Sequence, residues 1–198
     1  IIIDPPAAPA RPKDASFPLS GGNDVIKDAT TSTSTLIQSD FIGDESLQNG
    51  LHAFDPIDDI NIVAIPDWQE NGLIKAATTY CENRRDCFFV ADPKPALLPS
   101  GTDTTTTIRG FKQGLTSMYG ALYYPWIIIN DPLTGRRKKI PPSGAVVGTY
   151  SKTDITRGVH KAPAGTIDGA LNIAVDVETL VAKGEQDSLN PEGINVIR

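Results

Sequence analysis

The chain has 198 residues, and its 18 lysines and arginines against 24 aspartates and glutamates give a formal net charge of −6 at pH 7. This acidic balance argues against a nucleic-acid-binding protein, which normally carries a basic patch. No apolar run approaches the ~18 residues that span a bilayer, while hydrophobic residues make up 39% of the chain, enough for a buried core. We therefore expect a globular, mildly acidic protein with no nucleic-acid partner and no membrane partner.

The N-terminal residues 1–42 carry no recognisable motif. Proline, alanine, serine and threonine dominate residues 4–35, and proline removes backbone donors and disfavours helix. We therefore predict an extended arm, or the end of a preceding or inserted domain, over residues 1–42. Because the sequence opens on Ile1–Ile3 and closes as a strand begins, we expect a piece of a longer chain. Its core domain is then expected over residues 43–198, truncated at its C-terminal end.

A strand–helix–strand unit is predicted early in the core domain. Residues 61–66 form a short, nearly continuous apolar run, as strands buried on both faces of a parallel sheet do. Asp67 is a candidate N-cap for a helix whose apolar side chains recur through Tyr80. A second buried strand is predicted over residues 87–91. Two buried strands joined by a helix with short connections predict a βαβ unit.

The middle of the chain predicts a helix followed by a hairpin. Apolar residues recur at helical spacing over residues 108–122, which predicts an amphipathic helix. Residues 126–129 are predicted to be a core strand and a third member of the same sheet. Residues 131–135 have strong turn chemistry, so residues 136–140 are predicted to return as the second strand of a hairpin.

The last third predicts smaller elements. Residues 145–150 fit either a strand or the start of a short helix, and residues 151–165, which lack an apolar period, predict an ordered surface loop. Alternating apolar residues over 171–177 predict a half-buried strand. A short helix over 185–189 precedes a last strand that begins at Ile194. The predicted fold class is α/β, a mostly parallel sheet with flanking helices and a β-hairpin insertion.

Two cysteines, Cys81 and Cys87, are six residues apart. This spacing fits neither a CxxC redox pair nor a zinc pattern. Cys81 falls late in the predicted helix and Cys87 opens the second buried strand. We interpret both as small buried apolar residues rather than as a disulfide.

Motifs of the common enzyme classes are missing from the sequence. There is no GxSxG nucleophile elbow, and neither GxxxxGK[ST] nor GxGxxG follows a predicted strand. The two histidines, His52 and His160, lie in different segments. We accordingly predict no cofactor and no metal site.

Carboxylates give the least implausible catalytic candidates. Asp55, Asp58 and Asp59 cluster, and we interpret them as turn residues before a strand. Asp67 and Asp92 follow predicted strands, where α/β proteins place ligand sites, but a helix cap and a turn before proline account for them as well. Because no acid, base and nucleophile converge, the residues by themselves predict a non-enzymatic α/β domain.

Two basic segments stand out in this acidic chain. One lies in the second strand of the predicted hairpin and the other within the predicted surface loop. Their members are Arg136, Arg137, Lys138 and Lys139, and Arg157, His160 and Lys161. Clustered charges of this kind indicate either a solvated face or a contact with an acidic neighbour.

Several motifs, in a fixed order, resemble the contractile tail sheath proteins of bacteriophages. They are residues 121–126, 130–135, 141–144, 150–154, 156–165 and 185–195. Gly50 and Leu51, together with residues 55–67, are similar to the family's entry into its first core strand. The resemblance covers residues 43–198.

The resemblance implies a structural protein without enzymatic activity. Sheath subunits stack as hexameric rings around an inner tail tube in a metastable extended helix. A trigger at the baseplate lets them rearrange to a shorter, wider helix, which drives the tube through the host envelope. The same fold serves R-type bacteriocins, extracellular contractile injection systems and, more distantly, type VI secretion sheaths. Terminal arms in this family add strands to neighbouring subunits.

The resemblance also implies partners and a location. The expected partners are other sheath subunits, the tube protein, the baseplate and the tail terminator, in the virion tail and, during assembly, in the host cytoplasm. Since sheath and tube meet through opposed charges in related systems, we hypothesise that Arg157, His160, Lys161 or residues 136–139 contact the tube or another subunit. The alternative interpretation is an α/β enzyme or nucleotide-binding domain whose site is unrecognised.

Overall fold

The computed structural model describes residues 37–198. Most of the predicted arm over residues 1–42 lies outside the described residues, and its last residues form a short helix, α1 (Gln38–Ile42). A short 3₁₀ helix, η1 (Gly50–Phe54), follows.

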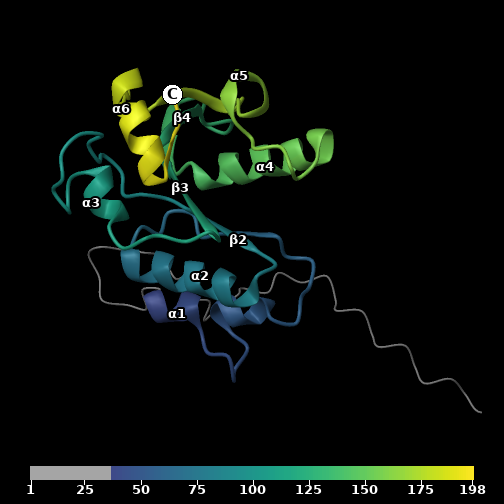
Figure 1. The fold of residues 1–198 in the computed structure, drawn as a ribbon. Coiled ribbons are helices and arrows are strands. Elements are labelled where there is room, and N and C mark those ends of the chain that lie inside the picture. Colours follow the sequence, from purple (N-terminus) through teal and green to yellow (C-terminus); the bar gives the residue numbers. More distant parts are fainter. Residues whose placement is uncertain (1–36) are drawn as a thin grey trace, which may run out of the picture. The chain divides into compact units, whose positions relative to one another are not determined.

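Four parallel strands form the main sheet (Figure 1). In spatial order they are β1 (Ile62–Ala64), β2 (Phe88–Ala91), β3 (Gly120–Tyr124) and β7 (Ile194–Val196). The two strands of the predicted βαβ unit and the predicted last strand are confirmed, as is the mixed α/β class with a mostly parallel sheet.

Helices cover both faces of this sheet. Side chains alternate across a strand, so Phe89 joins the buried core on the side of α2 (Asn71–Arg84). Its neighbour Phe88 faces the other way, with its ring 6.1 Å from that of Tyr150 in α4 (Ser143–Arg157). Figure 1 shows α2 and α4 on opposite sides of the strands. The result is a three-layer α/β/α arrangement.

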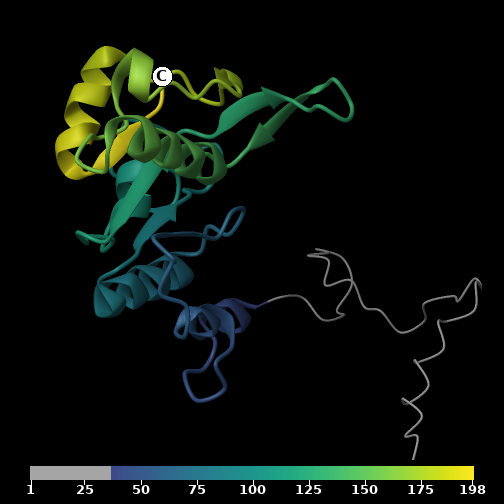
Figure 2. The same cartoon turned by 90° about the vertical axis from the view of Figure 1, so that its right-hand side faces the viewer.

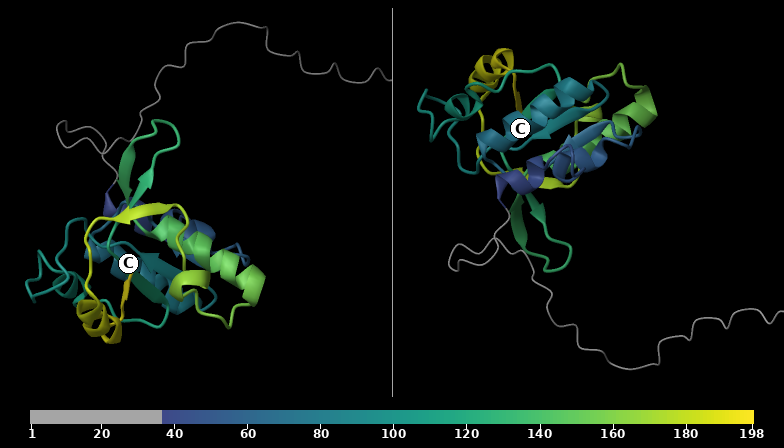
Figure 3. Two further views of the ribbon diagram at one scale, coloured as in Figure 1. Left: turned by 90° about the horizontal axis from the view of Figure 1, so that it is seen from above. Right: turned by 90° about the horizontal axis from the view of Figure 1, so that it is seen from below.

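A second, antiparallel sheet has the order β5-β4-β6. Its strands are β4 (Ile127–Asn130), β5 (Arg137–Ile140) and β6 (Ala174–Val177). The predicted hairpin is confirmed as β4–β5, which extends away from the parallel sheet in Figure 2 and is crossed at its base by β6 in Figure 3.

The prediction that residues 126–129 add a third strand to the parallel sheet is wrong. The place beside β2 is taken by β3, and β7, from the end of the chain, pairs with the other edge of β3. The backbone partners of β4 are β5 and β6 instead. An apolar run reveals a buried strand but carries no information about which strand it pairs with.

The predicted helix over residues 108–122 is also wrong beyond its first turn. Helix α3 ends at Lys112 (Ile108–Lys112), and the chain then passes through Gly114 at a φ of 82°. Met118, one of the apolar residues of the predicted helical pattern, is 87% exposed. Leu122 belongs to β3 and packs in the core from there. The apparent helical period arose because a short helix and a strand both contribute apolar residues to one core.

Two helix boundaries also differ from prediction. Residues 145–150 are helical, and α4 continues to Arg157, so the predicted surface loop over 151–165 is wrong for its first half. Asp67 is not a helix cap: its φ is 64°, and α2 begins only at Asn71. The chain needs residues 65–70 to turn from the sheet into the helix layer.

The remaining elements complete the described chain. They are α5 (Gly165–Asp168), the predicted short helix as α6 (Lys183–Leu189), and η2 (Asn190–Glu192). Cys81 and Cys87 are free and buried, which confirms their interpretation as apolar core residues.

Candidate assembly surfaces

The basic run of the hairpin is partly neutralised within the chain. Arg137 Nη1 lies 3.5 Å from Asp176 Oδ2, and Lys139 Nζ lies 2.6 Å from Glu178 Oε1. Both acids come from β6 or the residue after it, on the far side of β4. Sequence reasoning did not single out these partners, because they lie about forty residues away in the chain. The positive charges of Arg137 and Lys139 are therefore paired with carboxylates of the same chain.

The other two members of the run are exposed. Within residues 37–198, Arg136 and Lys138 form no ion pair. Leu133, in the turn between the two strands, is 93% exposed. The hairpin tip therefore exposes two cations and one large aliphatic side chain.

The second basic segment converges on one carboxylate. Arg157 Nε lies 3.4 Å from Asp168 Oδ1, and Lys161 Nζ lies 3.9 Å from Asp168 Oδ2. Thr153, buried in α4, donates its hydroxyl to the Asp168 backbone carbonyl at 3.4 Å. Asp168 thus ties the end of α4 and the following loop to α5. The structure brings together Arg157 and Lys161, with exposed His160 in the same loop.

Aliphatic side chains are exposed around this cluster. Ile155, Val159 and Ile167 are 86%, 85% and 76% exposed. They belong to α4, to the loop after it and to α5, the elements that Asp168 ties together. Single exposed aliphatics are ordinary, but a group on one fastened segment is typical of an interaction surface.

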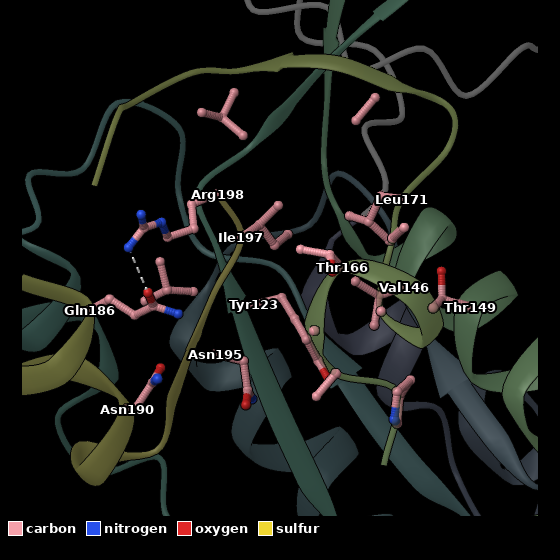
Figure 4. A pocket seen from close by; sticks show the side chains of 18 of the residues that line it. Tyr123, Val146, Thr149, Thr166, Leu171, Gln186, Asn190, Asn195, Ile197 and Arg198 are labelled. Atoms are coloured by element: carbon pink, nitrogen blue, oxygen red, sulfur yellow. Dashed lines mark hydrogen bonds between the residues drawn. The ribbon is translucent and has the colours of Figure 1, made fainter. Parts of the chain in front are cut away.

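A groove of about 970 Å³ opens beside β7. Figure 4 shows Asn195 and Ile197 of the β7 segment on one side and Val146, Thr149 and Leu171 on the other, with Tyr123 between them. In the described part of the chain β7 pairs only with β3, so its other edge has no strand partner. An unpaired strand edge beside an apolar groove is a site where another strand can add.

Three of the alternating apolar residues of 171–177 line the same groove, namely Leu171, Val175 and Val177. Residues 174–177 do form a strand, but Val175 is 48% exposed and Ile173 is 55% exposed. Leu171, Val175 and the 84% exposed Leu180 are among the lining residues. The predicted strand is confirmed over residues 174–177 only, and its apolar side chains are partly covered by residues 37–198, with Ile173 and Val175 exposed.

Asp92, one of the two catalytic candidates, has a structural role. It is 2% exposed and accepts hydrogen bonds from the backbone N–H of Ser143 at 2.8 Å and from its hydroxyl at 2.6 Å. Burial raises the pKa of Asp92 to about 6, against the opposing effect of the two hydrogen bonds. The carboxyl group thus joins the end of β2 to the first turn of α4.

The other polar candidates show no converging chemistry. Asp55 binds His52 at 2.9 Å and Tyr80 at 2.7 Å, which fastens η1 to α2. Asp67 is exposed, and its negative charge contributes to the raised pKa of Asp92. Residues 37–198 contain no group of three His, Cys, Asp or Glu side chains that could hold a metal ion. Over the same residues no helix has the length and apolarity to cross a membrane.

Comparison with known proteins identifies the family of this chain. The family model described as phage tail sheath protein central domain matches residues 41–198. A chain from the cryo-EM structure of the anti-feeding prophage (AFP) baseplate, 6-fold symmetrised, is 31% identical, with a TM-score of 0.53. The comparison with curated proteins found no match. The chain therefore belongs to the phage tail sheath protein family, a family of structural proteins.

The similarity is partial in length. It covers 73% of this chain and 36% of the baseplate-structure chain, so the chain spans about a third of that protein. The resemblance that the sequence motifs indicated is confirmed over nearly the same residues.

Proposed function

We propose that this chain is part of a subunit of a contractile tail sheath. Such subunits assemble as hexameric rings, stack into a helical polymer around an inner tube, and contract to drive the tube through the target envelope, as in viral genome ejection. The family match over residues 41–198 is the observation that carries this proposal. The similarity to a chain of a sixfold-symmetrised baseplate structure supports it.

The exposed surfaces support an assembly role. The groove beside β7 and the exposed aliphatics around Asp168 are apolar areas of the kind that an assembly covers. Contacts between different surfaces of identical subunits generate rings or helical polymers. The proposed partners are neighbouring sheath subunits, the tube protein, the baseplate and the tail terminator, in the phage tail and, during assembly, in the host cytoplasm.

Electron microscopy of the intact gene product tests the sheath assignment. Tubes or polysheaths are expected, with a longer, narrower form around the tube and a shorter, wider form after triggering. A monodisperse, non-polymerising protein that a small-molecule ligand stabilises would instead support the α/β enzyme or nucleotide-binding alternative.

We further propose that the cluster at Arg157, His160 and Lys161 contacts the tube or a neighbouring subunit. The double variant Arg157→Glu/Lys161→Glu is expected to lower tube-templated assembly about tenfold or more, because reversing two charges at one interface costs on the order of 1 kcal/mol each. The measurement is sedimentation of sheath on preformed tubes, at low and at high salt.

A triple variant separates contact from local folding. Both cations pair with Asp168, so the double variant also places like charges together. Adding Asp168→Lys restores the local pairing with inverted sign while the exposed surface stays reversed. Assembly that stays weak in the triple variant supports a contact role, and assembly that recovers shows that the residues only fasten α5. The same logic applied to Arg136→Glu/Lys138→Glu tests the hairpin.

A further inference from the structure

Two buried thiols face each other at the end of α2. The Sγ atoms of Cys81 and Cys87 are 3.4 Å apart. Cys81 is 0% exposed in the last turns of α2, and Cys87 is 4% exposed immediately before β2. A disulfide has an S–S distance of about 2.0 Å, so the two sulfurs need to approach by about 1.4 Å, within the reach of side-chain rotation.

The turn between the two thiols is held in place. Arg85 takes a left-handed conformation, with a φ of 65°, and its N–H donates to the Cys81 carbonyl at 2.8 Å. Arg84 donates to Asp86 at 2.7 Å and reaches back to the carbonyl of Phe54 at 2.5 Å. The closeness of the two sulfurs is therefore a property of a fixed turn and not of a loose chain end.

We propose that Cys81 and Cys87 are a modification site at which a small two-electron oxidant closes an intrachain disulfide between α2 and β2. With a diazene such as diamide, the first thiolate adds to the nitrogen–nitrogen double bond. The second thiolate then attacks the sulfur of this adduct, the S–S bond forms, and the S–N bond breaks. The two thiols together lose two protons and two electrons. The diazene takes up these two protons and two electrons and leaves as the hydrazine.

Burial controls the rate of this step. Burial raises the pKa of both thiols, so the nucleophilic thiolate is scarce near neutral pH. Oxidation is therefore slow in the native state and accelerates as the pH rises toward 9. The same burial shields the finished disulfide from thiol reductants, since exchange requires access to a sulfur atom.

The disulfide would act as a clamp in the oxidised form of the protein. It closes a short loop of seven residues counted from Cys81 to Cys87, and cross-linking stabilises a fold chiefly by restricting the unfolded chain. Its biological setting rests on the proposed function: a tail component is made in a reducing cytoplasm and then leaves it, and compartments of this kind differ in disulfide stability. The cysteine chemistry is tested on the chain itself, so its failure leaves the sheath assignment intact.

The test compares protein treated with diamide and protein treated with a phosphine reductant. After removal of the reagent and unfolding in urea, N-ethylmaleimide is expected to add twice to the reduced protein and not at all to the oxidised protein, on a monomer band. The thermal midpoint of the oxidised protein is expected to rise by about 5 °C. The variant Cys87→Ala keeps an apolar side chain and is expected to show no rise.

Three results would overturn the proposal. They are thiols that stay reactive after native-state oxidation at pH 9, disulfide-linked dimers in place of a linked monomer, and an intrachain disulfide that leaves the midpoint unchanged or lower. If Cys87→Ala does not fold, Cys81→Ala serves as the control.

Discussion

Replacing Asp92 by alanine is expected to lower the free energy of unfolding by about 3 kcal/mol. The substitution removes the acceptor of the Ser143 N–H and hydroxyl, and Ser143 is 0% exposed, so bulk water does not reach these groups in the folded chain. The first turn of α4 loses its link to β2. Urea unfolding of the purified chain at pH 7, followed by circular dichroism, measures the change.

The variant Asp92→Asn is the matched control. Its side-chain oxygen can accept from the Ser143 N–H and its amide can donate to the Ser143 hydroxyl, so we expect a loss within about 1 kcal/mol. A loss as large as that of the alanine variant would contradict the hydrogen-bond explanation. An unchanged stability of Asp92→Ala would contradict the capping role altogether.

The difference in stability between wild type and Asp92→Asn is expected to change with pH in a defined direction. The pKa of Asp92 is raised from 3.8 to about 6, so the folded state binds more protons than the unfolded state between these values. Stability contributed by this carboxyl group therefore rises as the pH falls from about 7 to about 4, by an amount on the order of 3 kcal/mol. Asp92→Asn lacks this gain, so wild type should gain on the variant toward pH 4. A difference in the free energy of unfolding between wild type and Asp92→Asn that stays constant from pH 7 to pH 4 would contradict the raised pKa of Asp92.

Substituting Gly110 by alanine is expected to destabilise the chain by about 3 kcal/mol. Gly110 lies in α3, where a Cβ atom would stand 2.1 Å from the Asp103 carbonyl oxygen and 2.3 Å from the Thr104 Cα. These are backbone atoms, held in a turn in which Asp103 accepts from the N–H groups of Thr105 and Thr106. The backbone of Asp103 and Thr104 cannot move away from the added Cβ without breaking these hydrogen bonds. The measurement is the urea midpoint together with the slope of the transition.

The opposite sign is expected for Gly148→Ala, which serves as control. Gly148 is an exposed interior residue of α4, with no heavy atom within 4 Å of the added Cβ. Alanine restricts the unfolded chain and favours helix, so a gain of about 0.5–1 kcal/mol is expected. Equal effects of the two substitutions would show that space around the glycine does not decide the outcome.

The charged segments illustrate how tertiary contacts change the meaning of a sequence feature. In the sequence, Arg157 and Lys161 are two cations in an acidic chain. In the structure they share Asp168, so part of their charge is satisfied within the subunit. The proposed contact surface combines residual positive charge with the exposed side chains of Ile155 and Val159. A contact built there depends on apolar area as well as on charge.

Local sequence patterns predicted the structure correctly where all residues of a segment belong to one element with one kind of burial. The apolar runs at residues 61–66 and 87–91 predict buried parallel strands, because both faces of such strands are covered and every position tends to be apolar. The turn chemistry of residues 131–135 predicts the hairpin, since it acts over a few bonds. The family resemblance rests on ordered motifs and is confirmed over residues 41–198.

Other features depended on distant parts of the chain. The split of residues 108–122 into α3 and β3 follows from the place of β3 between β2 and β7, which no local period reveals. The first turn of α4 is held by Asp92, fifty-one residues before Ser143. The groove beside β7 is assembled from segments between Tyr123 and Arg198.

The sequence by itself determined the α/β class, the hairpin and the family, because these depend on short-range patterns of polarity, turn residues and motif order. Only the tertiary structure decided the strand order, the ionic partners of the basic segments and the closeness of Cys81 to Cys87. Those features are pairings between residues or surfaces, and a pairing is fixed by the free energy of packing the whole chain rather than by either partner's local preference.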